Sequence, residues 1–132
     1  MDSPLVTAVV VVAIAFVTLR MIPRLLAGVP FVDPKVVYDV MQDDEGIVMI
    51  DVRTPEEFNS FHAPDSINVE PYKLGEDIEE KRPYMNNKVY VICLSSQRAA
   101  MAARTLKNLG FKNVSVVKGG LNLWKKRGLP IT

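Results

Sequence analysis

The sequence has little of what metal and disulfide sites are made from, since its 132 residues include one cysteine, Cys93, and one histidine, His62. A single cysteine excludes a disulfide within the chain. It also excludes a second thiol that would resolve an oxidised Cys93, so another molecule has to do so. One cysteine and one histidine far apart in the sequence give no metal-ligand spacing, and we expect neither a metal nor a cofactor.

An excess of one charge is also missing. The 16 lysines and arginines are balanced by 15 aspartates and glutamates, and the net charge is +1. The charges are mixed along the chain, and no basic patch or nucleic-acid-binding motif is visible, so we expect no nucleic-acid partner. The length is that of one domain with an additional segment.

Charge is absent altogether from residues 4–19, PLVTAVVVVAIAFVTL. If Arg20 extends toward water, this apolar stretch comes close to the roughly 20 residues that a membrane span requires. A signal peptide carries positive charge before its apolar core, whereas Arg20 and Arg24 follow this one, and no clear cleavage site comes after them. We therefore expect a single-pass membrane anchor with its N-terminus outside and the rest of the chain in the cytoplasm. A cleaved signal peptide is the alternative.

Residues 1–30 are thus predicted to be a transmembrane helix and a linker, and residues 31–132 a folded domain in which strand and helix signals alternate. The predicted strands are the apolar runs 47–50, 66–69, 89–92 and 114–117. The predicted helices begin at Pro34 and Pro55, cover residues 74–81 and 99–109, and end with a short helix around Trp124. Continuously apolar strands alternating with helices predict an α/β fold, a parallel sheet with helices on both faces.

The centre of this pattern is Cys93, which ends one predicted strand and precedes an alanine-rich helix. In a parallel sheet the carboxyl ends of the strands share one edge, so residues 51–53 and 93–98 should meet there. Backbone N–H groups at the helix start, the helix dipole and Arg98 all favour a thiolate. The alternative is that Cys93 is a small buried hydrophobic residue.

Three segments resemble the rhodanese (sulfurtransferase) family. Residues 51–58, DVRTPEEF, followed by His62, Pro64, Ile67 and Asn68, resemble its D-x-R, E-F and G-H-x-P-G-A-x-N signature. Residues 93–98, CLSSQR, resemble the six-residue active loop C-x-x-G-x-R, and residues 119–130 resemble G-G-x-x-x-W-x-x-x-G-x-P.

Three positions depart from the family pattern. Phe61 and Asp65 stand in place of two glycines around the histidine and proline, and Ser96 stands in place of the active-loop glycine. If the position of Ser96 required a positive φ, serine there would cost about 1 kcal/mol or more.

The resemblance implies a rhodanese-like fold and a two-step sulfur transfer. Cys93 would take sulfur from a small anionic donor such as thiosulfate, become a persulfide, and pass the sulfur to a thiol or a protein acceptor. The substrate-binding residues implied are Leu94, Ser95, Ser96, Gln97 and Arg98, whose backbone N–H groups would surround the sulfur while the Arg98 guanidinium holds the donor. The supporting residues implied are Asp51, Arg53 and Glu57, with Arg53 paired to Glu57 or to another carboxylate.

Other functions remain open. A phosphatase of this fold has a C-x5-R loop, one residue longer than the loop that begins at Cys93, and the shorter loop suits a sulfur atom better than a phosphate. The second alternative is a catalytically silent binding or regulatory module. The third is a redox sensor in which Cys93 forms a sulfenate or a mixed disulfide.

Overall fold

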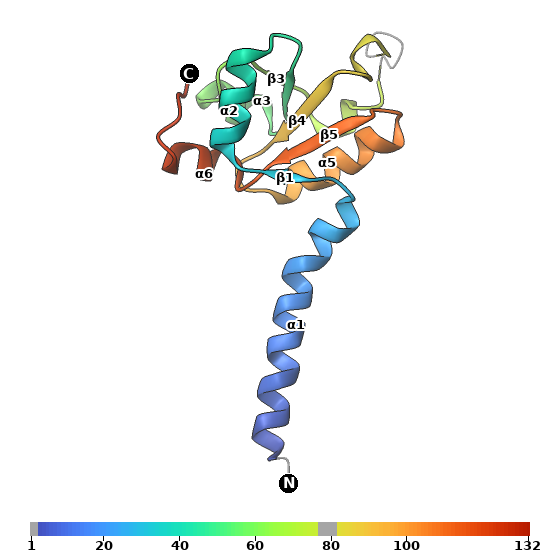
Figure 1. Cartoon of the computed structure of the whole chain (residues 1–132), viewed down its shortest axis with the longest axis vertical. Coiled ribbons are helices and arrows are strands. Elements are labelled where there is room, and N and C mark those ends of the chain that lie inside the picture. Colours follow the sequence, from blue (N-terminus) through green and yellow to red (C-terminus); the bar gives the residue numbers. More distant parts are fainter. Residues whose placement is uncertain (1–2, 77–81) are drawn as a thin grey trace.

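The structure is a computed structural model, and it describes residues 3–76 and 82–132. At its centre is a five-stranded sheet in the order β1-β5-β4-β2-β3, in which every pair of neighbouring strands is parallel (Figure 1). The strands are β1 (Phe31–Val32), β2 (Val48–Asp51), β3 (Ser66–Asn68), β4 (Lys88–Ile92) and β5 (Asn113–Val117). The predicted parallel α/β fold and its four predicted strands are therefore confirmed. The edge strand β1 was not predicted, because two residues are too few to show a period.

Helices cover both faces of this sheet. Helix α5 (Gln97–Asn108) packs its alanines and Leu106 against Val89 and Val91 on one face. On the other face, α2 (Pro34–Asp43) and α6 (Gly120–Lys126) pack against Tyr90 and Ile92. Successive residues of β4 thus point into two different apolar layers, which is why the strand reads as a continuous apolar run.

Two helices begin as their sequences predict. Asp33 caps α2 and accepts a hydrogen bond from the Lys35 N–H at 2.9 Å. Thr54 caps α3 (Pro55–Ser60) in a capping box with Glu57. Each cap satisfies N–H groups that have no partner inside the helix, and so fixes where the helix starts.

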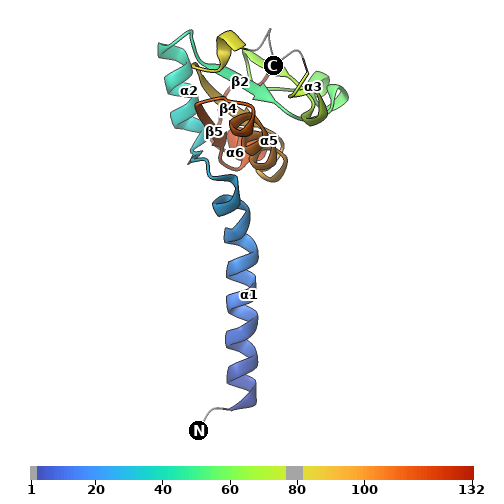
Figure 2. The same ribbon diagram turned by 90° about the vertical axis from the view of Figure 1, so that its right-hand side faces the viewer.

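Helix α1 (Pro4–Ala27) extends away from the domain in both views, and the N-terminus lies at its far end (Figures 1 and 2). Its residues Pro4–Met21 have a mean hydropathy of 2.2 and none is buried. By length and composition this helix can cross a membrane, although a signal sequence has the same properties. The predicted linker differs from the structure, because the helix continues through Pro23 to Ala27 and stops at Gly28, whose φ is 60°.

The domain is joined to α1 by contacts that begin immediately after the helix. Lys107 of α5 donates from Nζ to the Gly28 carbonyl at 2.9 Å. Val29 is buried in the α5 layer, and the Pro30 carbonyl accepts from the Val116 N–H of β5. The division at residue 30 stays a prediction.

Two short 3-10 helices lie among the described residues between β3 and β4. A 3-10 helix, η1 (Pro71–Lys73), runs into a turn with Leu74 buried, and a second 3-10 helix, η2 (Arg82–Tyr84), precedes β4. Of the helix predicted for residues 74–81, residues 77–81 lie outside the described residues. Residues 74–76 form a turn.

Candidate active site

Cys93 follows the last residue of β4 and lies beside the end of β2. Asp51 and Ile92 are in register on these two strands, and the Val52 N–H donates to the Ile92 carbonyl at 3.0 Å. The strand ends thus bring residues 51–53 and the loop 93–98 together, as the parallel order requires. Cys93 is 1% exposed, and its Sγ accepts a hydrogen bond from the Ala99 N–H at 3.4 Å. The donor belongs to the first turn of α5, one residue beyond the five predicted.

The loop 93–98 is fastened at its back by the start of α6. The Leu121 N–H donates to the Cys93 carbonyl at 2.9 Å, and the Asn122 N–H donates to the Leu94 carbonyl at 3.0 Å. These are N–H groups that the first turn of a helix leaves without internal partners. The helix start therefore holds the loop by its carbonyls.

Gly120 allows this close approach. Its φ is 57°, and a Cβ there would overlap the carbonyl oxygens of Cys93 and Ser95 and lie 2.7 Å from the Leu94 carbonyl carbon. The glycine pair belongs to one of the motifs quoted above. Its packing against the loop was missed, because no sequence signal connects two segments so far apart.

Ser96 fits its position without strain. Its φ is −145°, which any residue adopts, so the condition for a strain cost is not met. Its hydroxyl oxygen accepts from the Gly119 N–H at 2.9 Å, and its carbonyl accepts from the Ala100 N–H at 2.9 Å. Ser96 thus ties the loop to the α6 turn through a side chain that glycine lacks. On either side of it, Ser95 and Gln97 are exposed.

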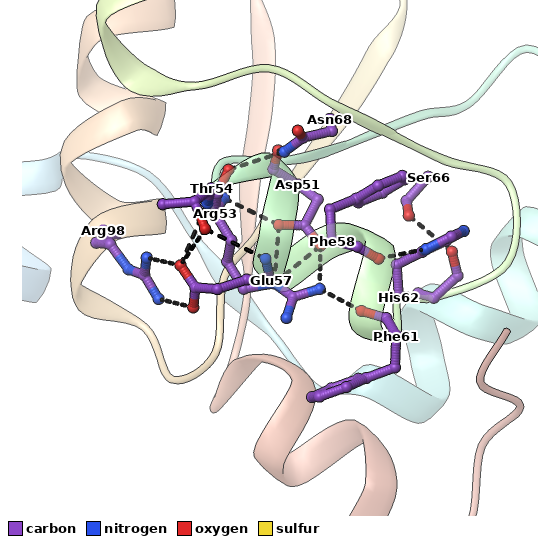
Figure 3. Close-up of polar contacts among 11 residues, drawn as sticks. Asp51, Arg53, Thr54, Glu57, Phe58, Phe61, His62, Ser66, Asn68 and Arg98 are labelled. Atoms are coloured by element: carbon purple, nitrogen blue, oxygen red, sulfur yellow. Dashed lines mark hydrogen bonds and ion pairs between the residues drawn. The ribbon is translucent and has the colours of Figure 1, made fainter.

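The Arg98 guanidinium forms a bidentate ion pair with Glu57, at 2.8 Å from Nη1 to Oε1 and 3.0 Å from Nη2 to Oε2 (Figure 3). The hydrogen bonds from Arg98 are the main cause that lowers the pKa of Glu57 to about 2. The pKa of Arg98 is raised, first by its hydrogen bond to Glu57 and also by the charges of Cys93 and Asp51. The guanidinium therefore already has an anionic partner while it lies within electrostatic reach of the sulfur.

Arg53 pairs with Asp51, not with Glu57. The two side chains are 1% and 0% exposed, and the Arg53 Nη2 lies 2.9 Å from the Asp51 Oδ2. Arg53 also donates from Nη2 to the Phe61 carbonyl at 2.6 Å, and Asn68 donates from Nδ2 to the carbonyls of Asp51 and Arg53 (Figure 3). The prediction left open whether Arg53 pairs with Glu57 or with another carboxylate. The structure shows the second case, with Asp51 as the partner. The pair supports the end of β2 from inside.

The loop after α3 is held by local contacts. The Phe58 and His62 rings stack at 3.8 Å, and the His62 Nδ1 lies 2.8 Å from the Phe58 carbonyl oxygen. At the two positions where the family pattern has glycine, Phe61 is extended with a φ of −168°, whereas Asp65 has a φ of 63°. Only Asp65 therefore adopts the left-handed conformation that favours glycine.

Comparisons with known proteins agree with this geometry. The Rhodanese-like domain profile matches residues 33–127. Thiosulfate sulfurtransferase GlpE of Pseudomonas syringae is 33% identical over 82 residues, which are 62% of this chain and 76% of GlpE. The putative sulfur carrier protein YrkF of Bacillus subtilis is 33% identical over 100 residues, 74% of this chain and 52% of YrkF, so the chain spans about half of that relative.

Among solved structures, a rhodanese-related protein from Thermoplasma volcanium superposes with a TM-score of 0.67 at 28% identity, over 78% of this chain and 97% of the other. A profile that covers most of the chain, together with relatives named as sulfurtransferases, settles the family. The chain belongs to the rhodanese-like domain family.

Proposed function

We propose that the chain is a membrane-anchored sulfurtransferase that carries sulfur as a persulfide on Cys93. The observation that carries the proposal is the place of the sulfur, at the end of β4 and facing the first turn of α5, with the Ala99 N–H donating to Sγ. An N–H group at a helix start favours a negative charge on the atom it faces. The family relatives add that thiosulfate is a donor used on this fold.

In the first step the Cys93 thiolate attacks the outer sulfur of thiosulfate. A bond forms between Sγ and that sulfur, the bond between the two sulfurs of thiosulfate breaks, and sulfite leaves with its electron pair. The product is a persulfide anion on Cys93. In the second step a thiophilic acceptor attacks the outer sulfur, and Cys93 leaves as the thiolate that began the cycle.

The surrounding residues have distinct parts in this scheme. Hydrogen bonds from Leu121 and Asn122 hold the loop so that Sγ stays beside the Ala99 N–H. Arg98 supplies positive charge for the incoming donor, and its ion pair with Glu57 competes with that role. Asp51 and Arg53 keep the neighbouring strand end in place.

Mass spectrometry of the purified full chain after exposure to thiosulfate tests the proposal. We expect a 32 Da adduct on Cys93 and release of sulfite, and we expect neither in Cys93→Ser. A matched control is the double variant Cys93→Ser, Met101→Cys, because Met101 lies on the same helix and is 74% exposed. This control carries an accessible thiol away from the loop and should gain no adduct. An adduct of equal yield on the control would show that the loop 93–98 does not make Cys93 more reactive toward thiosulfate than an ordinary exposed thiol.

The burial of Cys93 favours a second candidate, a rhodanese-fold binding module without turnover. A thiol that is 1% exposed reacts only if its neighbours move aside. This candidate predicts neither adduct nor sulfite in wild type. The same experiment therefore separates the two.

The membrane location is the part of the proposal that rests on α1. The apolar stretch Pro4–Met21, of which no residue is buried and in which residues 4–19 carry no charge, supports a single-pass anchor. Arg20 and Arg24 at its domain end support a cytoplasmic domain. Met101→Cys offers an exposed thiol for labelling in cells. An impermeant maleimide should label it in lysates and not in intact cells. Labelling in intact cells would contradict the orientation.

A further inference from the structure

A hollow of about 670 Å³ lies between the domain end of α1 and the start of α5. Phe16, Val17 and Arg20 line it from α1, and Ser95, Ser96 and Gln97 line it from the loop that follows Cys93. Pockets for small molecules in proteins have volumes of about 300–1,000 Å³. The hollow is thus large enough for a ligand and shares its wall with the active loop.

The α1 wall of this hollow belongs to the stretch that can cross a membrane. Phe16 and Val17 are 60% and 54% exposed, and both lie within the apolar window Pro4–Met21. At 1.5 Å per residue, the last turn and a half of that window is about 8 Å long. In an anchored chain the hollow therefore opens at the boundary between hydrocarbon and headgroups.

The two walls differ in chemistry. The α1 wall is apolar except for the Arg20 guanidinium, which lies 5.3 Å from the centroid of the Phe16 ring. The facing wall presents the polar residues Ser95, Ser96 and Gln97 beside the apolar Phe31 and Ala100. A molecule with one alkyl chain and a small polar or anionic head matches both walls. A peptide segment would bind poorly at the edge of the membrane hydrocarbon, because its backbone N–H and C=O groups would lack hydrogen-bond partners there.

We propose that the hollow receives a membrane-dissolved alkyl thiol and that this thiol is the sulfur acceptor. The inference rests on the proposed function and names the acceptor class for the same site. The acceptor thiol attacks the outer sulfur of the Cys93 persulfide, a new S–S bond forms, and the bond to Sγ breaks. The alkyl thiol becomes an alkyl persulfide, Cys93 becomes a thiolate, and the acceptor's proton goes to that thiolate or to water. Cys93 itself does not line the hollow, so the outer sulfur, about 2 Å beyond Sγ, has to reach it past the loop residues that do.

The test uses the full chain in phosphatidylcholine vesicles with thiosulfate as donor. Dodecanethiol is the membrane-dissolved acceptor, and 2-mercaptoethanol is the soluble one. Val17→Trp fills the hollow, and Val11→Trp places the same side chain on a residue of α1 that is 59% exposed and does not line it. Persulfide products and sulfite are measured by mass spectrometry and colorimetry.

We expect Val17→Trp to lower turnover with dodecanethiol at least tenfold more than turnover with 2-mercaptoethanol, and Val11→Trp to change neither. Turnover with 2-mercaptoethanol but not with dodecanethiol in wild type would overturn the acceptor class and leave the sulfurtransferase standing. Equal effects of Val17→Trp on turnover with both thiols would also overturn it. Absence of turnover with both thiols would overturn this inference, and absence of the 32 Da adduct on Cys93 as well would overturn the proposed function.

Discussion

Gly120→Ala tests whether the start of α6 positions the active loop. Alanine at a φ of 57° costs about 1 kcal/mol for the left-handed conformation. The added Cβ meets the backbone of the loop, with the Leu94 carbonyl carbon 2.7 Å away. Backbone cannot rotate aside as a side chain can, and such overpacking costs about 1–3 kcal/mol. The expected loss in the free energy of unfolding is therefore about 2–4 kcal/mol.

The chain offers a matched control in Gly128→Ala. Gly128 has a φ of 72° and nothing within 4 Å of a built Cβ, so the substitution carries the conformational cost without the overlap. We expect a loss of about 1 kcal/mol for this control. The difference between the two variants then isolates the contact with the loop.

Two assays read the outcome. Urea unfolding of the full chain in detergent can be followed by the fluorescence of Trp124, the one tryptophan, which is 1% exposed. The rate of sulfite release from thiosulfate reports whether the loop 93–98 is correctly placed. A displacement of reacting groups by about 1 Å can lower a reaction rate about a hundredfold. Gly128→Ala should keep the wild-type rate. Equal losses of stability and equal rates in the two variants would refute the reasoning.

Three further predictions concern the ion pairs and caps around the site. Arg53→Met leaves the Asp51 carboxylate buried without its cation and should lower the free energy of unfolding by about 3–5 kcal/mol in urea titrations, a value that a loss under 1 kcal/mol would contradict. Because its pairing with Arg98 lowers the pKa of Glu57 from 4.5 to about 2, the ion pair should stabilise the fold above pH 4.5 and lose that effect as the pH falls toward 2. The stability difference between wild type and Glu57→Gln, about 1 kcal/mol since Glu57 is 34% exposed, should therefore be full at pH 6 and vanish near pH 2, whereas a constant difference would argue against the pair. Thr54→Ala should cost about 1 kcal/mol by thermal or urea unfolding, and Thr54→Ser should restore most of it if the cap is the cause.

The sequence predicted helices and strands well where the stabilising contacts join residues close together in the chain. The caps at Asp33 and Thr54 join residues two or three positions apart, so sequence spacing suffices to find them. The apolar runs likewise located the strands, while their register came only from the structure. Val36 shows the limit, because it is as apolar as its neighbour Val37 but is 50% exposed, while Val37 is fully buried. Neighbours on a helix lie about 100° apart, and apolar character alone does not choose between them.

Long-range partners were predicted less well. The sequence suggested Glu57 or another carboxylate for Arg53, and the choice depended on which side chain is enclosed at the end of β2. Asp51 is fully buried there, whereas Glu57 lies near the surface and faces Arg98 from 41 positions away. The role of Gly120 was hidden for the same reason. A single sequence gives no signal for contacts that arise from the meeting of two separate strand ends.

The unbroken course of α1 to Ala27 has an electrostatic consequence if α1 is the anchor. The six residues after Met21 rise about 9 Å, so the domain begins within reach of the lipid headgroups. An anionic leaflet carries a surface potential of about −30 mV, which disfavours a dianion by about 1.4 kcal/mol and lowers its local concentration about tenfold. Thiosulfate bears two negative charges, whereas an alkyl thiol bears none. The lipid composition would then set how well each substrate reaches Cys93, with anionic lipids raising the apparent KM for thiosulfate and salt lowering it again.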